Sequence, residues 1–185
     1  EVDQFGTALL DLGLKGANIA VIGENRYEWC LSYLSVTCGC GVIVPIDKEL
    51  HAEEVAMILN QSEAKVLIFS GKIFDKNLQE ALKLNETVQI LICMDEEQHE
   101  SGGKDYFTIG TLLERGKQLL EDGDRRYIDS VVDSYVMSVL LFTSGTTGVA
   151  KGVMLSQRNI CADIESVTQC LDNDCTDSVL SILPI

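Results

Sequence analysis

The amino-acid sequence predicts an α/β fold in which a mostly parallel β-sheet is covered by helices on both faces. Short apolar runs alternate along the chain with longer stretches of helical periodicity. The runs are apolar throughout, which is typical of strands buried on both faces of a parallel sheet. A chain of 185 residues is also long enough to bury such a sheet.

The first part of the chain is expected to contain a helix, a strand, a second helix and a second strand. The first helix covers residues 4–13, and the strands cover residues 19–23 and 42–46. Asn25 and Glu28 have the spacing of a capping box at the start of the second helix. The apolar face of this second helix is expected to carry Tyr27, Cys30, Leu31 and Leu34.

The remainder of the chain continues this alternation. Further strands are expected at residues 64–70, 88–94, 136–142 and 179–183, with a short apolar run at residues 153–155. Helices are expected around residues 52–59, 74–85 and 112–120, with a charged loop at residues 95–104. Ser156 is a candidate N-cap of a last helix whose apolar side carries Ile160, Ile164, Val167 and Leu171.

The composition excludes several classes of function. A formal net charge of −15 argues against nucleic-acid binding, which requires a basic patch. The seven cysteines are an odd number without a CxxC pair, so buried, reduced thiols are expected rather than disulfides or a metal site. Cys161 and Cys170 are assigned to core packing, whereas His51 and His99 are expected to be exposed to solvent. We expect no membrane-spanning segment.

A stretch rich in glycine and hydroxyl side chains follows the predicted strand at residues 136–142. Glycines allow several backbone N–H groups to point into one concavity, hydroxyl groups add donors, and a lysine adds positive charge. This chemistry suits a pyrophosphate or a triphosphate. The candidate phosphate-binding residues are Thr143, Ser144, Gly145, Thr146, Thr147, Gly148 and Lys151.

The stretch does not satisfy the Walker A pattern G-x-x-x-x-G-K-[ST]. Gly145 and Lys151 have the required separation, but Ala150 replaces the second glycine and Gly152 replaces the hydroxyl residue that binds magnesium. A Walker-like NTPase or phosphotransferase therefore remains a weak alternative. A non-catalytic nucleotide-binding module is another alternative that the residues leave open.

Residues 141–152 closely resemble the signature loop of the adenylate-forming, or AMP-binding, superfamily, Thr-Ser-Gly-[Ser/Thr]-Thr-Gly-x-Pro-Lys-Gly. Only the proline differs, because Ala150 takes its place. The segments at residues 14–28 and 41–46 also resemble family segments, and Gln157 stands where the family has histidine. Residues 25–29 and 154–156 look most like those of long-chain fatty acyl-CoA synthetases.

The resemblance implies an ATP-dependent acid–thiol ligase that activates a fatty acid as its acyl-adenylate and transfers it to coenzyme A. ATP, Mg²⁺ and coenzyme A are the implied cofactors and co-substrates, and the predicted loop would wrap the β- and γ-phosphates. The implied partners are small molecules, with no nucleic acid. The reduced thiols indicate a cytoplasmic protein. The resemblance is compatible with peripheral membrane association and leaves the oligomeric state open.

The resemblance covers nearly the whole chain, so residues 1–185 are expected to form a single, partial AMP-binding N-terminal domain. The family's later ribose-binding segment and its small C-terminal domain with a catalytic lysine find no counterpart in this sequence. No catalytic residue and no metal ligand is therefore assigned within these residues. We expect this polypeptide to be inactive by itself.

Overall fold

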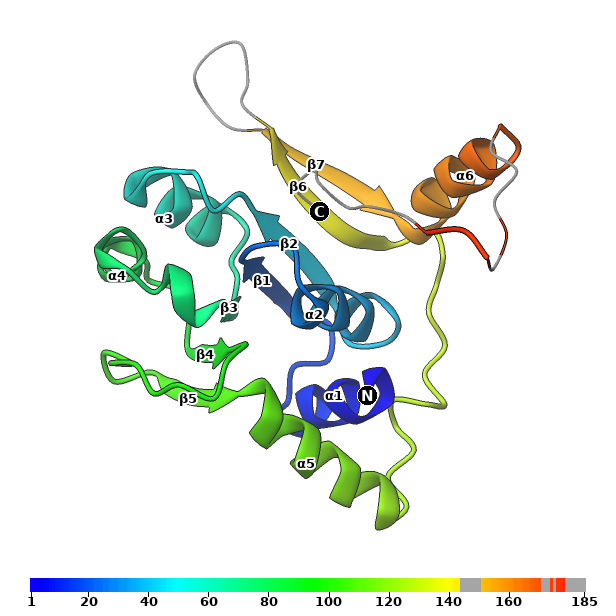
Figure 1. Ribbon diagram of the computed structural model, residues 1–185, viewed down its shortest axis with the longest axis horizontal. Helices are drawn as coiled ribbons and strands as arrows, with labels where there is room; N and C mark the ends of the chain where they lie inside the picture. The colour runs from blue at the N-terminus through cyan, green and yellow to red at the C-terminus, as the bar shows by residue number, and fades with distance from the viewer. Residues whose placement is uncertain (144–150, 171–173, 175, 179–185) are drawn as a thin grey trace.

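The computed structural model describes residues 1–143, 151–170, 174 and 176–178 (Figure 1). These residues form a seven-stranded sheet in the order β5-β4-β3-β1-β2-β6-β7. Neighbouring strands are parallel from β5 to β6, and β7 pairs antiparallel with β6 at the edge. The strands are β1 (Asn18–Ile22), β2 (Val42–Ile46), β3 (Val66–Phe69), β4 (Ile90–Cys93), β5 (Asp105–Thr108), β6 (Met137–Thr143) and β7 (Lys151–Ser156).

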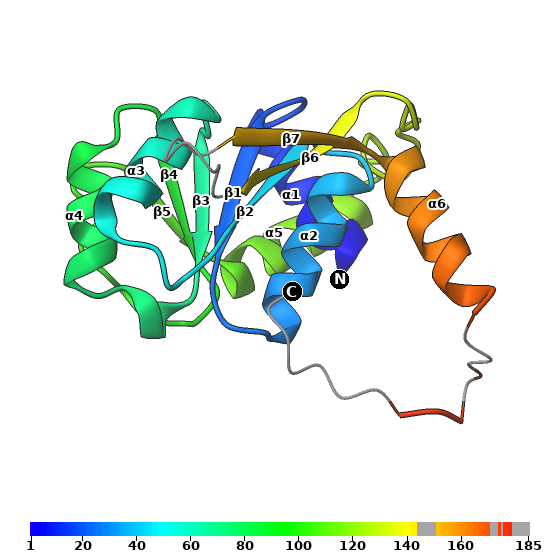
Figure 2. The same ribbon diagram turned by 90° about the horizontal axis from the view of Figure 1, so that it is seen from above.

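Helices cover both faces of the sheet, which confirms the predicted architecture. The helices are α1 (Val2–Asp11), α2 (Tyr27–Thr37), α3 (Ala52–Gln61), α4 (Lys76–Leu84), α5 (Ile109–Glu121) and α6 (Gln157–Thr168), with a 3-10 turn η1 (Gly71–Ile73). Helices α1, α2 and α5 form one core with the sheet, and α3 and α4 form the other (Figures 1 and 2). Successive residues of a central strand serve opposite cores: Ile19 and Val21 belong to the first, Ala20 and Ile22 to the second.

The predicted apolar face of α2 is largely wrong. Tyr27 and Leu34 are 63% and 46% exposed, and Cys30 is also exposed. The helix instead buries a face that contains Trp29 and Ser35. Hydroxyl side chains can be buried in a helix when they bond the backbone, as Ser35 does by donating to the carbonyl of Val2 in α1. The predicted capping box is also wrong, because Arg26 rather than Asn25 occupies the N-cap position.

Strand β5 was not predicted, because it begins at the charged and exposed Asp105 and only Thr108 of its four residues is fully buried at the sheet edge. Helices α1 and α5 approach each other so closely that there is no room for a side chain at one contact position of α5. A Cβ built on Gly116 in α5 would overlap the backbone carbonyl of Gln4 in α1. The glycine is therefore required by the contact between the two helices.

The sequence predicts whether four polar or reactive side chains are buried or exposed, and three of these predictions are wrong. Cys161 and Cys170 are exposed, because α6 extends away from the sheet and buries none of its residues (Figure 2). His99 lies against the rings of Phe69 and Phe74, with ring centroids 5.8 and 4.5 Å away, because the charged loop folds back over this part of the core. His51 is exposed at the start of α3, as predicted.

Candidate functional site

The described residues of the predicted phosphate-binding stretch lie at one end of the paired strands β6 and β7. Thr143 ends β6, Lys151 begins β7, and the two are directly opposite each other in the antiparallel register. Both are exposed. Ser144, Gly145, Thr146, Thr147 and Gly148 lie outside the described residues. The structure thus brings together the two predicted site residues that flank the stretch, and places a hydroxyl group and an ammonium group at the same end of the sheet.

One face of the hairpin changes from apolar to polar toward this tip. Side chains alternate between the faces of a strand, so Val139, Leu141 and Thr143 share one face of β6. Their antiparallel partners on β7 are Leu155, Val153 and Lys151 in the same order. Directly opposite residues point to the same face of a sheet. Two apolar pairs therefore lead up to the Thr143–Lys151 pair.

A polar cleft of about 480 Å³ lies where β1, β2 and β6 reach their carboxyl ends. Ligands of open parallel sheets bind outside the carboxyl ends of the strands. The cleft is lined by Gly23, Glu24, Asn25, Trp29, Pro45, Ile46, Asp47, Lys48, Glu49, Leu141 and Phe142. Its three carboxylates outnumber its one lysine, so the cleft itself does not attract a bare phosphate.

The Arg26 cluster joins the loops that follow β1, β3 and β4, and it contacts Glu24 in the lining of this cleft. Arg26 donates to Glu28 through Nε at 2.6 Å and lies 2.9 Å from Asp95 through Nη1. Asp95 also accepts from the backbone N–H of Gly71 at 2.8 Å. Glu24 lies 3.8 Å from Arg26. These contacts connect residues that lie far apart in the sequence. They therefore fix the ends of β1, β3 and β4 relative to one another.

The same contacts lower the pKa of two carboxyl groups. The hydrogen bond from Arg26 is the main reason that the pKa of Glu28 lies below its ordinary value. Burial by itself would raise the pKa of Asp95, but the Gly71 N–H and Arg26 outweigh burial and the pKa is lowered. Both groups contribute stability when they are ionised.

Arg26→Gln is expected to lower the free energy of unfolding at pH 7 by on the order of 2 kcal/mol, because hydrogen bonds to charged groups are lost. The wild type should then lose more stability than the variant as the pH falls through and below 4.5 and 3.8, the ordinary pKa values of Glu and Asp. The unfolded chain takes up these protons first, since the folded pKa values are lower. Urea unfolding between pH 7 and pH 3 measures both effects.

Arg125→Gln is the matched control, because Arg125 pairs with Asp129 on the surface, with both side chains about 60% exposed. It should change stability little at any pH. A difference between wild type and Arg26→Gln that stays constant down to pH 3 would contradict the assigned role of the Arg26 cluster.

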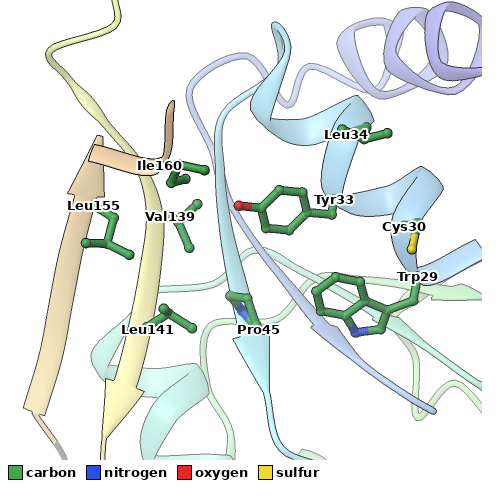
Figure 3. A pocket seen from close by; sticks show the side chains of 9 residues that line it. All are labelled: Trp29, Cys30, Tyr33, Leu34, Pro45, Val139, Leu141, Leu155 and Ile160. Atoms are coloured by element: carbon green, nitrogen blue, oxygen red, sulfur yellow. The ribbon is translucent and has the colours of Figure 1, made fainter. Parts of the chain in front are cut away.

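An apolar groove of about 500 Å³ lies beside the polar cleft, between α2 and the β6–β7 hairpin (Figure 3). It is lined by Trp29, Cys30, Tyr33, Leu34, Pro45, Val139, Leu141, Leu155 and Ile160. The sequence reasoning missed this groove. The sequence feature that corresponds to the groove is the apolar stripe of Cys30 and Leu34 on α2. The sequence predicts that this stripe faces the core, but it lines an open surface instead.

The described residues contain no group of three or more His, Cys, Asp or Glu side chains positioned to hold a metal ion. Within the same described part of the chain, every helix is too short or too polar to cross a membrane.

The chain is similar in sequence to fatty-acid-activating enzymes. It is 30% identical over 157 residues to long-chain-fatty-acid–CoA ligase ACSBG1 of Rattus norvegicus, covering 82% of this chain and 21% of that protein. It is 28% identical to long-chain-fatty-acid–CoA ligase 1 of Homo sapiens, covering 98% of this chain and 27% of that protein. The chain thus spans about a quarter of the length of the relatives it matches.

Solved structures share the fold. A Rhodopseudomonas palustris protein assigned as a long-chain-fatty-acid CoA ligase has a TM-score of 0.80 at 17% identity, covering 99% of this chain and 42% of that chain. The N-terminal domain of FACL13 from Mycobacterium tuberculosis has a TM-score of 0.72 at 24% identity with the same coverage. The AMP-binding enzyme family matches residues 1–185. Sequence, fold and the signature stretch agree, and the chain belongs to the AMP-binding enzyme family.

Proposed function

We propose that this chain is the part of an ATP-dependent acid–thiol ligase that holds the triphosphate end of ATP. The observation that carries the proposal is the direct pairing of Thr143 with Lys151 at the tip of the β6–β7 hairpin. The pairing brings a hydroxyl and an ammonium group to the two ends of the Gly/Ser/Thr stretch. An anion between them would be bound by charge-assisted hydrogen bonds.

The complete reaction would have two steps. A carboxylate oxygen attacks the α-phosphorus of ATP, and the bond to pyrophosphate breaks; the thiol of coenzyme A then attacks the acyl carbonyl, and AMP leaves. In the first step Thr143 and Lys151, with residues 144–148, would stabilise the negative charge that builds up on the pyrophosphate. Such preorganised donors act where charge develops in the transition state.

Mg²⁺ would enter with the nucleotide. Proteins bind this ion mainly through substrate phosphates and water, with one or two carboxylates, and the acidic lining of the polar cleft fits that mode. When bound, Mg²⁺ neutralises phosphate charge. The residues of this chain would orient the phosphates through the hairpin and supply the positive charge of Lys151.

Long-chain fatty acids are the proposed substrates, supported by the names of the relatives. The proposed location is the cytoplasm, and residues 1–185 would be part of the large N-terminal domain of the ligase.

The Walker-like alternative is disfavoured, because Lys151 begins a β-strand, whereas the P-loop lysine lies at the start of a helix. A non-catalytic nucleotide-binding module is the remaining alternative.

ATP–pyrophosphate exchange by the full-length product of the gene, against a panel of carboxylic acids, tests the proposal. Exchange stimulated most strongly by long-chain fatty acids is the expected result, while the 185-residue chain is expected to bind MgATP without catalysing exchange. Stronger stimulation by aryl or amino acids would contradict the substrate, and no exchange with any acid would favour the non-catalytic module. Steady exchange by the 185-residue chain alone would contradict its expected inactivity.

A further inference from the structure

The segments on both sides of the β6–β7 hairpin are hydrogen-bonded to the last turn of α2. The connection from α5 enters β6, and α6 leaves β7, at the same end of the hairpin (Figure 1). In that connection the Tyr127 hydroxyl donates to the carbonyl of Ser35 at 2.9 Å. At the start of α6 the Gln157 side-chain amide donates to the carbonyl of Thr37 at 2.5 Å. One helix end therefore contacts the chain both before and after the hairpin.

The two carbonyls are acceptors that the helix itself does not use. The last four carbonyls of an α-helix have no partner within the helix. Those of Leu34 and Val36 accept from backbone N–H groups that follow α2. Ser35 and Thr37 are buried, so their carbonyls would be costly to leave without a donor. The hydroxyl and the amide supply these donors, and both bonds fix the hairpin relative to α2.

Strand pairing holds the hairpin to the rest of the sheet at few positions. Strands β1 and β2 pair at five positions. In the part of the chain that the structure describes, β6 pairs with β2 only through Val139 and Ile43. Leu155 and Ile160 are only partly buried against the core. A rotation of the hairpin about the β2–β6 pair would therefore break few backbone contacts, and the bonds to α2 oppose it.

We propose that Gln157 is a positioning residue for phosphate binding, because its bond to α2 fixes the direction in which the hairpin presents Thr143 and Lys151. The inference rests on the proposed function, which assigns the triphosphate to that pair. Gln157 does not reach the phosphates itself: Lys151 and Ser156 are separated by the length of β7, about 17 Å at about 3.4 Å per residue. Tyr127 has the corresponding role for the segment that enters β6.

The length of β7 makes phosphate binding sensitive to a small rotation at the other end of the hairpin. A rotation of about 10° moves a point about 17 Å away by about 3 Å. A displacement of that size takes a donor out of hydrogen-bonding range. If only a fraction of the molecules hold the hairpin in the correct direction, the apparent affinity falls by that fraction. One neutral hydrogen bond shifts such an equilibrium by roughly twofold to tenfold.

The first test compares the MgATP affinity of variants of the 185-residue chain by titration calorimetry. Gln157→Leu should weaken binding by roughly twofold to tenfold. Gln157→His keeps an N–H donor and should stay within about twofold of the wild type. Gln157→Glu keeps the shape but turns a carboxylate toward the Thr37 carbonyl, and it should weaken binding at least as much as Gln157→Leu.

Gln118→Leu is the matched control. The Gln118 amide also donates a hydrogen bond, at 3.1 Å to Asp122, but both residues lie at the exposed end of α5. Its loss should leave the MgATP affinity unchanged. Equal affinities for Gln157→Leu and Gln118→Leu would overturn the inference.

The second test measures the hairpin without nucleotide, by hydrogen exchange of the backbone amides. Gln157→Leu should speed exchange in residues 137–143 and 151–156 by roughly twofold to tenfold, while α1 and α4 exchange as in the wild type. Tyr127→Phe removes the hydroxyl and keeps the ring, which fills the space beside Gly6. This second variant should speed exchange in residues 137–143. Faster exchange throughout the chain would show general destabilisation and would contradict a positioning role.

Lys151→Ala separates this inference from the function on which it rests. Weaker MgATP binding by Lys151→Ala together with wild-type affinity of Gln157→Leu would overturn the positioning role and leave the proposed function standing. Wild-type affinity of Lys151→Ala would contradict the proposed function, and the positioning role with it. Unchanged exchange of the hairpin in Gln157→Leu would overturn the positioning role whatever the nucleotide measurements show.

Discussion

Lys151→Ala is expected to weaken MgATP binding by this chain between about tenfold and a hundredfold. A hydrogen bond to a charged group is worth about 1.5–3 kcal/mol, and each 1.4 kcal/mol corresponds to about tenfold in affinity. Lys151 is exposed at the start of β7, so the substitution removes a charge without opening a cavity in the core. Titration calorimetry with MgATP measures the change, and circular dichroism checks that the variant is folded.

Two further variants make the result specific to phosphate binding. Lys117→Ala removes an exposed lysine of α5, on the far side of the sheet from the hairpin tip, and should leave the affinity unchanged (Figure 1). Lys151→Arg keeps the charge and should retain part of the affinity. Equal affinities for Lys151→Ala and Lys117→Ala would show that Lys151 does not contact the nucleotide.

Gly116→Ala is expected to destabilise the fold by about 1–3 kcal/mol, as is typical when atoms are added to a closely packed interior. Helix propensity alone predicts the opposite sign, because alanine is favoured over glycine by about 1 kcal/mol inside a helix. The added methyl group would overlap the backbone carbonyl of Gln4, which cannot move without shifting α1. Thermal unfolding should show a lower midpoint, by roughly 2–4 °C for each kcal/mol.

Gly110→Ala in the same helix is the matched control. Its methyl group would meet the carboxylate of Glu96, the flexible end of a side chain that can swing away, although it then loses the hydrogen bond that it accepts from Thr108 at 2.9 Å. The gain in helix propensity offsets that loss, so this variant should be about as stable as the wild type. If both glycine substitutions had the same effect, the close contact between α1 and α5 would not be the reason for Gly116.

Much of the fold could be predicted because the strands are unusually uniform in composition. Runs such as Val66–Phe69 are fully buried and contain only apolar residues, so the sequence marks them clearly. The edge strand β5 carries Asp105 and is half exposed, and it was missed for that reason. Within the candidate site, the residue types of Thr143 and Lys151 predict phosphate binding, which stays a prediction, whereas their pairing across the two strands is found only in the structure.

The sequence by itself determined the parallel α/β sheet, the strand before the signature stretch and the family to which the chain belongs, because these depend on local periodicity and on one specific run of residues. Tertiary structure alone decided which side of α2 is buried, since an apolar stripe does not reveal what covers it. It also placed Thr143 opposite Lys151 and joined the apolar groove to that pair. Those relations depend on antiparallel register and on residues far apart in the sequence, such as Trp29 and Leu155, which only the packed chain brings together.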